Sequence, residues 1–196
     1  MAKKNKKIYL MSPIATLQYP YIFKADKFKN DEKYKVTFNV PIAEAQEMIK
    51  TIDDALARQV NLESLQGNTE WEEEHYVPYE VHEAAGYVQF YSYLNRFGNK
   101  GKPDQFEQRP AVFDAQNNPI AKPIQVFNGS RGRVQTEINA WTGDKNCGVT
   151  LRLKAVQLIE VVKQAVVSAE TYGFQKTEGF SANDPVEGEP AERQEY

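Results

Sequence analysis

Alternation of apolar and polar residues with a period of two is the feature that most limits the folds open to this chain. It recurs in short segments bounded by Gly, Pro, Asn or Asp, a pattern typical of strands and turns. The segments read "KIYLMSPIATL", "KYKVTFNV", "GYVQFYSYL", "AVFDA", "PIQVF", "GSRGRVQTEINAW" and "CGVTLRLKAVQLIEVV". Strands do not alternate with helices, which disfavours a doubly wound parallel sheet. The sequence therefore predicts a mainly β domain closed into a small barrel.

One helix interrupts these strands, in residues 41–62. Its apolar residues recur every three or four positions, and Pro41 suits a first helical turn. We expect the apolar stripe to cover the barrel core rather than to receive a partner. Residues 61–85 show no sustained period and are rich in carboxylates, so they predict an extended acidic connection.

Charge divides the chain into two parts. The formal net charge is −3, but residues 178–196 carry six acidic residues and one arginine, a local charge of −5, which leaves +2 for residues 1–177. The acidic part also contains Pro and Gly and few large apolar groups, so we expect it to be disordered. The sequence thus predicts one folded domain over residues 1–177 and an acidic tail over 178–196.

The sequence contains no sign of export or of a membrane span. No apolar run approaches the roughly 18 residues that a span needs, and no signal-peptide core follows the N-terminal cations. The single cysteine, Cys147, cannot form an internal disulfide. We expect a cytoplasmic protein that does not associate with membranes.

The stretch "GYVQFYSYLNRFGNKGKP", residues 86–103, is apolar or aromatic on both faces of a predicted strand. One face holds Val88, Phe90 and Leu94, which we expect in the core. The other face holds rings, and cations follow in a Gly-containing loop: Tyr87, Tyr91, Tyr93, Phe97, Arg96, Lys100 and Lys102. Rings that stack on bases, beside cations that neutralise phosphates, suit single-stranded nucleic acid. The alternative is that another element, such as a helix, covers the tyrosines.

Two later strands repeat this combination of cations and rings. Their inward positions are expected to be Val134, Thr136, Ile138 and Ala140 in the first and Val149, Leu151 and Leu153 in the second. The outward positions include cations and one indole: Arg131, Arg133, Trp141, Arg152 and Lys154. Any one of these is more often a solvated side chain than a ligand contact. These residues all occupy outward positions on neighbouring strands, and this shared orientation favours a binding face.

Catalytic and metal-binding patterns were sought as the competing explanation. Only His75 and His82 could serve as imidazole bases, and Cys147 has no histidine near it in the sequence. The acidic segment 72–83 matches neither the HExxH nor the EF-hand pattern of metal ligands, and "FGNKGKP" lacks the spacing of a phosphate-binding loop. We expect no catalytic residue, no metal site and no cofactor.

The second half of the chain resembles a known family, the phage-encoded single-stranded-DNA-binding proteins of the OB fold. The resemblance rests on "RPAVFDAQNNPIAKPIQVFNGSRGRVQTEINAW", on "CGVTLRLKAVQLIEVV" and on the acidic tail with its terminal aromatic residue. It implies a five-stranded OB barrel with one main helix. It also implies single-stranded DNA binding with little sequence preference, in phage DNA replication, recombination or repair in the host cytoplasm. In such proteins the tail contacts polymerase, helicase or a second subunit. The resemblance therefore leaves open whether this protein forms a homodimer.

The candidate residues follow from the residue patterns and from their position in the resemblance. The expected DNA-binding set is Tyr87, Tyr91, Tyr93, Arg96, Phe97, Lys100, Lys102, Arg131, Arg133, Trp141, Arg152 and Lys154. The expected partner-binding tail residues are Glu187, Glu189, Glu192, Glu195 and Tyr196. Two rival functions remain at this level: a structural or decoration protein of a virion, and a metal-dependent nuclease built on the carboxylates of residues 72–83. The choice between DNA and RNA also stays open.

Overall fold

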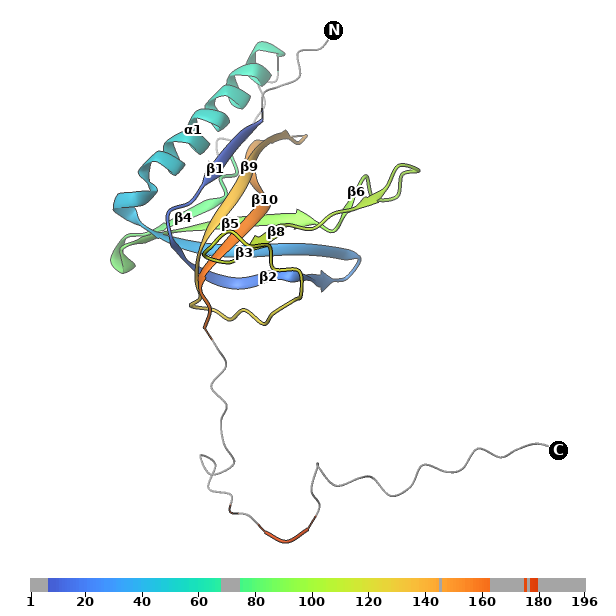
Figure 1. Ribbon diagram of the computed structural model, residues 1–196. Helices are drawn as coiled ribbons and strands as arrows, with labels where there is room; N and C mark the ends of the chain where they lie inside the picture. Colours follow the sequence, from blue (N-terminus) through green and yellow to red (C-terminus); the bar gives the residue numbers. More distant parts are fainter. Residues whose placement is uncertain (1–6, 68–74, 145, 163–174, 176, 180–196) are drawn as a thin grey trace, which may run out of the picture. The chain divides into compact units, whose positions relative to one another are not determined.

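A computed structural model gives the fold and describes residues 7–67, 75–144, 146–162, 175 and 177–179 (Figure 1). Its elements all belong to the compact unit Met1–Lys163. In chain order they are β1 (Ile8–Met11), β2 (Ala15–Phe28), β3 (Asp31–Pro41), α1 (Ile42–Leu65), β4 (Tyr79–His82), the short 3-10 helix η1 (Glu83–Ala85), β5 (Tyr87–Asn95), β6 (Phe97–Gly98), β7 (Phe106–Glu107), β8 (Ala111–Phe113), β9 (Arg131–Thr142) and β10 (Cys147–Glu160). The predicted boundary at residue 177 remains a prediction, and the tail residues 180–196 lie outside the described residues.

Five strands pair in a closed circuit. β2 pairs with β3, β3 with β5, and β9 with both β10 and β2, all antiparallel. The circuit closes where β5 pairs with β10 in parallel, with Ser92 opposite Leu151 and Tyr93 opposite Arg152. A closed five-stranded barrel of this kind is an OB fold. The prediction of a mainly β OB-fold barrel with one main helix is confirmed.

Most of the barrel core consists of the inward side chains that the alternation predicts, but the predicted inward position of Ala140 in β9 is wrong, because the alternation breaks there and Glu137 is buried instead. Val88, Phe90 and Leu94 of β5 are buried, as are Val149, Leu151 and Leu153 of β10. At its centre the rings of Phe38 and Phe90 stack with their centroids 5.4 Å apart. The opposite parity of each strand is therefore directed outward, which is the condition for a binding face on the barrel surface.

The helix α1 covers one end of the barrel (Figure 1). In the chain it follows β3 and precedes β4 and β5. Its residues Ala45, Met48, Ile52 and Ala55 are buried and join the barrel core. Their spacing of three and four positions places them on one helical face, so the predicted role as core cover is confirmed. No helix among the described residues is long and apolar enough to cross a membrane.

Among the segments that differ from the expectation for their local sequence are the acidic connection and residues 123–127. In the acidic connection, Tyr79 begins the short strand β4, because its ring packs against Phe90 at 6.0 Å and its hydroxyl donates to Asp53 Oδ1 at 2.9 Å. The predicted strand at residues 123–127 is wrong, since this segment has no strand pairing. Pro123 has no N–H to donate to a ladder and Ile124 is exposed.

Candidate nucleic-acid interface

Four outward side chains lie in one line across four adjacent strands. Strand pairing sets Tyr21 of β2 opposite Lys35 of β3, and Lys35 opposite Tyr93 of β5. Tyr93 in turn lies opposite Arg152 of β10. Tyr21 is 42% exposed and Tyr93 37% exposed, and Arg152 is exposed as well. We call this alternation of ring, cation, ring and cation the Tyr93 row.

Lysine side chains lie over both rings of the Tyr93 row. Lys35 Nζ is 5.0 Å from the centroid of the Tyr21 ring, and Lys33 Nζ is 5.3 Å from that of Tyr93. Contacts of this length are favourable between a cation and the face of an aromatic ring. Both lysines also form ion pairs, Lys35 with Asp26 at 2.5 Å and Lys33 with Asp31 at 3.4 Å. The row thus presents aromatic surface and positive charge within the reach of one ligand.

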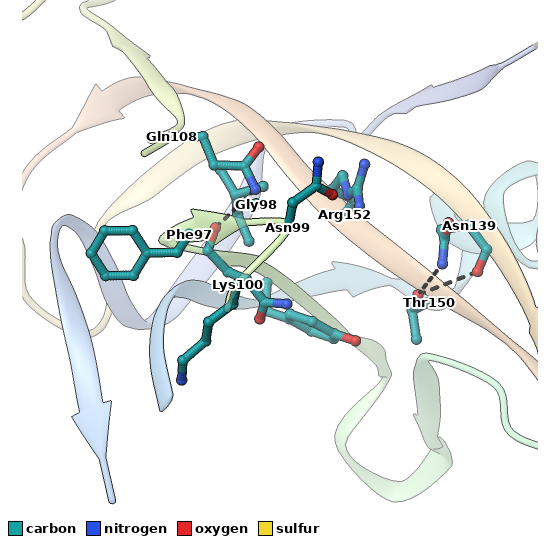
Figure 2. A pocket seen from close by; sticks show the side chains of 11 residues that line it. Phe97, Gly98, Asn99, Lys100, Gln108, Asn139, Thr150 and Arg152 are labelled. Carbon is teal, nitrogen blue, oxygen red and sulfur yellow. Dashed lines mark hydrogen bonds between the residues drawn. The ribbon is translucent and has the colours of Figure 1, made fainter. Parts of the chain in front are cut away.

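A cleft of about 280 Å³ borders the row at Tyr93 and Arg152 (Figure 2). Its walls come from β5, from the loop and hairpin that follow it, and from β9 and β10. On the β9–β10 side, Thr150 Oγ1 donates to the Asn139 carbonyl at 3.2 Å. Within the part of the chain that the structure describes, Arg152 forms no ion pair. Its charge is therefore available to an anionic ligand in this cleft.

Two predicted cations of the loop after β5 are engaged by carboxylates of the β2–β3 hairpin. Arg96 Nη1 lies 2.7 Å from Glu32 Oε2, and Lys100 Nζ lies 3.4 Å from Asp31 Oδ1. We call these two contacts the interhairpin ion pairs. Hydrogen bonds to Glu107 and Glu32 raise the pKa of Arg96, and the hydrogen bond from Lys100 lowers the pKa of Asp31. Phosphates would have to compete with these carboxylates for Arg96 and Lys100.

The tyrosines of β5 are not equally accessible. The hydroxyl of Tyr91 forms hydrogen bonds with Glu80 Oε2 at 3.0 Å and Gln89 Oε1 at 2.9 Å, and the ring is half-buried. Burial, followed by the hydrogen bond to Glu80, raises the pKa of Tyr91. Tyr87 is half-buried with its ring 4.9 Å from that of His82. Side chains of the strand β4 thus cover part of the predicted tyrosine face, and Tyr93 remains the exposed member.

The indole of Trp141 packs against the barrel surface and is only partly exposed to solvent. Its ring centroid lies 6.4 Å from that of Tyr76, and a Cβ at Gly148 would approach the indole to 2.7 Å. Only glycine at position 148 therefore lets the indole lie flat on the strand. No described residue accepts a hydrogen bond from the buried Trp141 Nε1. A stacking role for this indole remains a prediction.

The remaining predicted cations do not gather at the cleft beside Tyr93. Arg131 pairs with Glu160 at 3.2 Å, and Lys154 lies 3.6 Å from Glu137. Arg133 lines a separate cleft of about 870 Å³ with Met11 and Phe113. Strand length explains the separation of Arg133 from the cleft beside Tyr93, since about 3.3 Å per residue places it roughly 20 Å along β9 from Asn139, which lines that cleft. Phe97 and Lys100 do line the cleft beside Tyr93, whereas Lys102 is exposed and does not line it.

Sequence reasoning missed Tyr21 and gave no role to Lys33 and Lys35. Lys35 was visible as an outward position of its strand, but its neighbours across the hairpin were not. The β2–β3 register is irregular on either side of Tyr21, where Tyr19 has a φ of 48° and donates its backbone N–H to Asn128 Oδ1. Such an irregularity shifts the parity of the residues after it. Pairing the two segments as a hairpin is the signal that could have found Tyr21.

These features place the chain in the OB-fold class, with an outer face that combines rings and cations. Among solved structures it is similar to gp2.5, a single-stranded DNA binding protein encoded by bacteriophage T7, with a TM-score of 0.70 and 19% identity over 90% of this chain and 100% of that one. It is also similar to the single-stranded DNA-binding protein from bacteriophage Enc34 in complex with ssDNA, with a TM-score of 0.53 and 12% identity over 83% of this chain and 95% of that one. No protein-family model matches the sequence, and neither does any curated protein. The resemblance seen in the sequence is confirmed at the level of the fold.

Proposed function

We propose that this protein binds single-stranded DNA, with little sequence preference, on the outer face of its barrel. The observation that carries the proposal is the Tyr93 row, in which rings and cations alternate across four strands. Bases of any identity stack on aromatic rings, and the DNA backbone needs nearby positive charge. The similar solved structures support the proposal, because both are of phage proteins described as single-stranded-DNA-binding, and one contains the DNA.

In this proposal each group of the site has a defined task. The exposed face of Tyr93 stacks on a base, while Arg152 and the lysines over the rings bind the flanking phosphates. Asn139 and Thr150 supply hydrogen-bonding groups on the opposite side of the cleft. Arg96 and Lys100 join only when phosphates displace the carboxylates of the interhairpin ion pairs, and phosphates must likewise displace Asp31 and Asp26 from the two lysines. The tasks require positioning alone, and no bond is made or broken.

The cellular role that fits this activity is phage DNA replication, recombination or repair. The acidic tail 178–196 would recruit a partner protein such as a polymerase or helicase, or a second subunit. A nuclease built on residues 72–83 has no support in the described part of the chain, where no group of three or more His, Cys, Asp or Glu side chains could hold a metal ion. Glu72, Glu73 and Glu74 themselves lie outside the described residues. We therefore propose a binding protein rather than an enzyme.

Binding curves on single-stranded and double-stranded oligonucleotides over a range of salt concentrations test the proposal. Each phosphate contact contributes about −0.7 to the slope of log affinity against log salt for single strands. Contacts from Lys33, Lys35 and Arg152 therefore predict a slope of about −2 or steeper. Equal affinity for duplex DNA, or a flat salt response, would overturn the proposal. Cleavage of the oligonucleotide in Mg²⁺ or Mn²⁺ would indicate a nuclease instead, and a complete lack of retention would favour a virion protein.

A further inference from the structure

A second groove, of about 410 Å³, lies between α1 and the strands β1 and β9. We call it the helix groove. Lys7 precedes β1 at one rim, and Arg58, Gln59 and Leu62 of α1 form the other. Asn139 of β9 lines both the helix groove and the cleft beside Tyr93. The two depressions therefore adjoin at Asn139.

The rim of the helix groove is positively charged. Arg58 is exposed and forms no ion pair with any residue that the structure describes. The side chain of Lys7 is 60% exposed, with Nζ 3.3 Å from Glu137 Oε1. Glu137 is the carboxylate of the lining, and Lys154 also holds it, at 3.6 Å. Two cations against one shielded carboxylate leave a net positive charge that suits an anion.

The helical rim also offers apolar surface to such an anion. Ala55, Arg58, Gln59 and Leu62 are three, four and seven positions apart, so they share one face of α1. Ala55 is buried against the barrel, whereas Leu62 is 51% exposed. A ligand seated here would meet a guanidinium and an exposed aliphatic side chain one helical turn apart. A phosphate would pair with the guanidinium, and the apolar face of a sugar or base would pack against the aliphatic side chain.

We propose that the helix groove is a second segment of the path for single-stranded DNA. A strand that lies over Tyr93 and Arg152 continues past Asn139, and its phosphates reach Arg58 and Lys7. The inference rests on the proposed function and extends the site from the barrel face onto the helix. The position of the helix groove beside the cleft at Asn139 and the charge of its rim favour nucleic acid, rather than a peptide, as the occupant.

Oligonucleotide length separates the two segments of the path. OB folds occupy about 4 to 16 nucleotides, so thymidine oligomers spanning that range should fill the cleft beside Tyr93 first and the helix groove only when longer. Arg58→Ala should leave the affinity for the shortest bound oligomer unchanged. For the longest it should weaken binding by about two- to fivefold, as expected for one exposed ion pair. The salt slope for the longest oligomer should fall by about 0.7.

Lys122→Ala is the matched control, because Lys122 is an exposed cation that forms no ion pair with any described residue and does not line the groove. It should match the wild type at every length, and Arg58→Glu should weaken long oligomers further than Arg58→Ala. If Arg58→Ala behaves like Lys122→Ala on long oligomers, or weakens all lengths equally, the extended path is refuted while DNA binding stands. If the wild type binds no oligomer of any length, the proposed function fails as well.

Discussion

Replacement of Tyr93 by alanine is the most direct probe of the binding face. Tyr93 is an exposed ring of its row, 37% accessible, with Lys33 over one side and Arg152 in register with it. Loss of one stacked base costs about 1–3 kcal/mol of binding free energy. Because about 1.4 kcal/mol corresponds to a tenfold change, the dissociation constant for single-stranded DNA should rise by about 5- to 150-fold.

The test requires that the loss of DNA affinity come from removal of the ring and not from unfolding of the variant. Tyr93 is only partly buried, so its removal should lower the free energy of unfolding by about 1–2 kcal/mol, less than the 3–5 kcal/mol typical of a buried ring. Tyr93→Phe keeps the stacking surface and should bind like the wild type. Tyr93→Leu keeps apolar bulk without a π face and should lose most of the affinity. Fluorescence anisotropy with a labelled oligonucleotide measures all three, beside urea unfolding. Equal affinity of the alanine, leucine and wild-type proteins would refute stacking at this position.

Three further outcomes are expected. The triple variant D31N/E32Q/E107Q removes the carboxylates that pair with Arg96 and Lys100. Single-stranded DNA binding at low salt should therefore tighten, and the salt slope should steepen by up to about 1.4; an unchanged slope would show that these cations do not reach phosphate. Burial and the hydrogen bond to a carboxylate raise the pKa of Tyr79 to about 12, so the folded state holds this proton more tightly and stability should fall as pH rises from about 10 to 12. In urea unfolding Tyr79→Phe should remove that component, and equal pH profiles would contradict it. Deletion of residues 178–196 should tighten binding at low salt and less at high salt, because a tethered acidic tail competes with DNA and salt screens it; unchanged low-salt affinity would rule out such competition.

The core could be read from the sequence because burial follows local parity. Val36, Phe38 and Val40 alternate with polar residues, and all three are buried. The same reasoning holds for β5 and for most of β10, and it needs no knowledge of which strands pair. A single helix among many strands then leaves few architectures other than a small barrel. Local pattern therefore predicted a small barrel, although it missed β4 and predicted a strand at residues 123–127 that the structure lacks.

The binding face was less predictable because it depends on pairing and on contacts across strands. Arg133 and Arg152 share outward parity, yet β9 carries the first to a separate cleft. Arg96 has the residue type of a phosphate ligand, but Glu32 and Glu107 already occupy its guanidinium. Tyr21 follows a break in strand register that no periodicity reveals. The sequence therefore predicted an outer face with aromatic and basic residues. The structure was needed to show which of these residues lie side by side.

The pairing that closes the barrel is brief, and this has a consequence for its dynamics. β5 and β10 meet over two register pairs, Ser92 with Leu151 and Tyr93 with Arg152, although about sixty residues of chain separate the partners. A short junction between distant segments is the natural place for transient opening, which exposes its amides to hydrogen exchange. Tyr93 and Arg152 lie on opposite sides of that junction, so a ligand that contacts both would stabilise the pairing of β5 with β10. Occupancy of the outer face would then slow amide exchange at the junction and raise the melting temperature with ligand concentration.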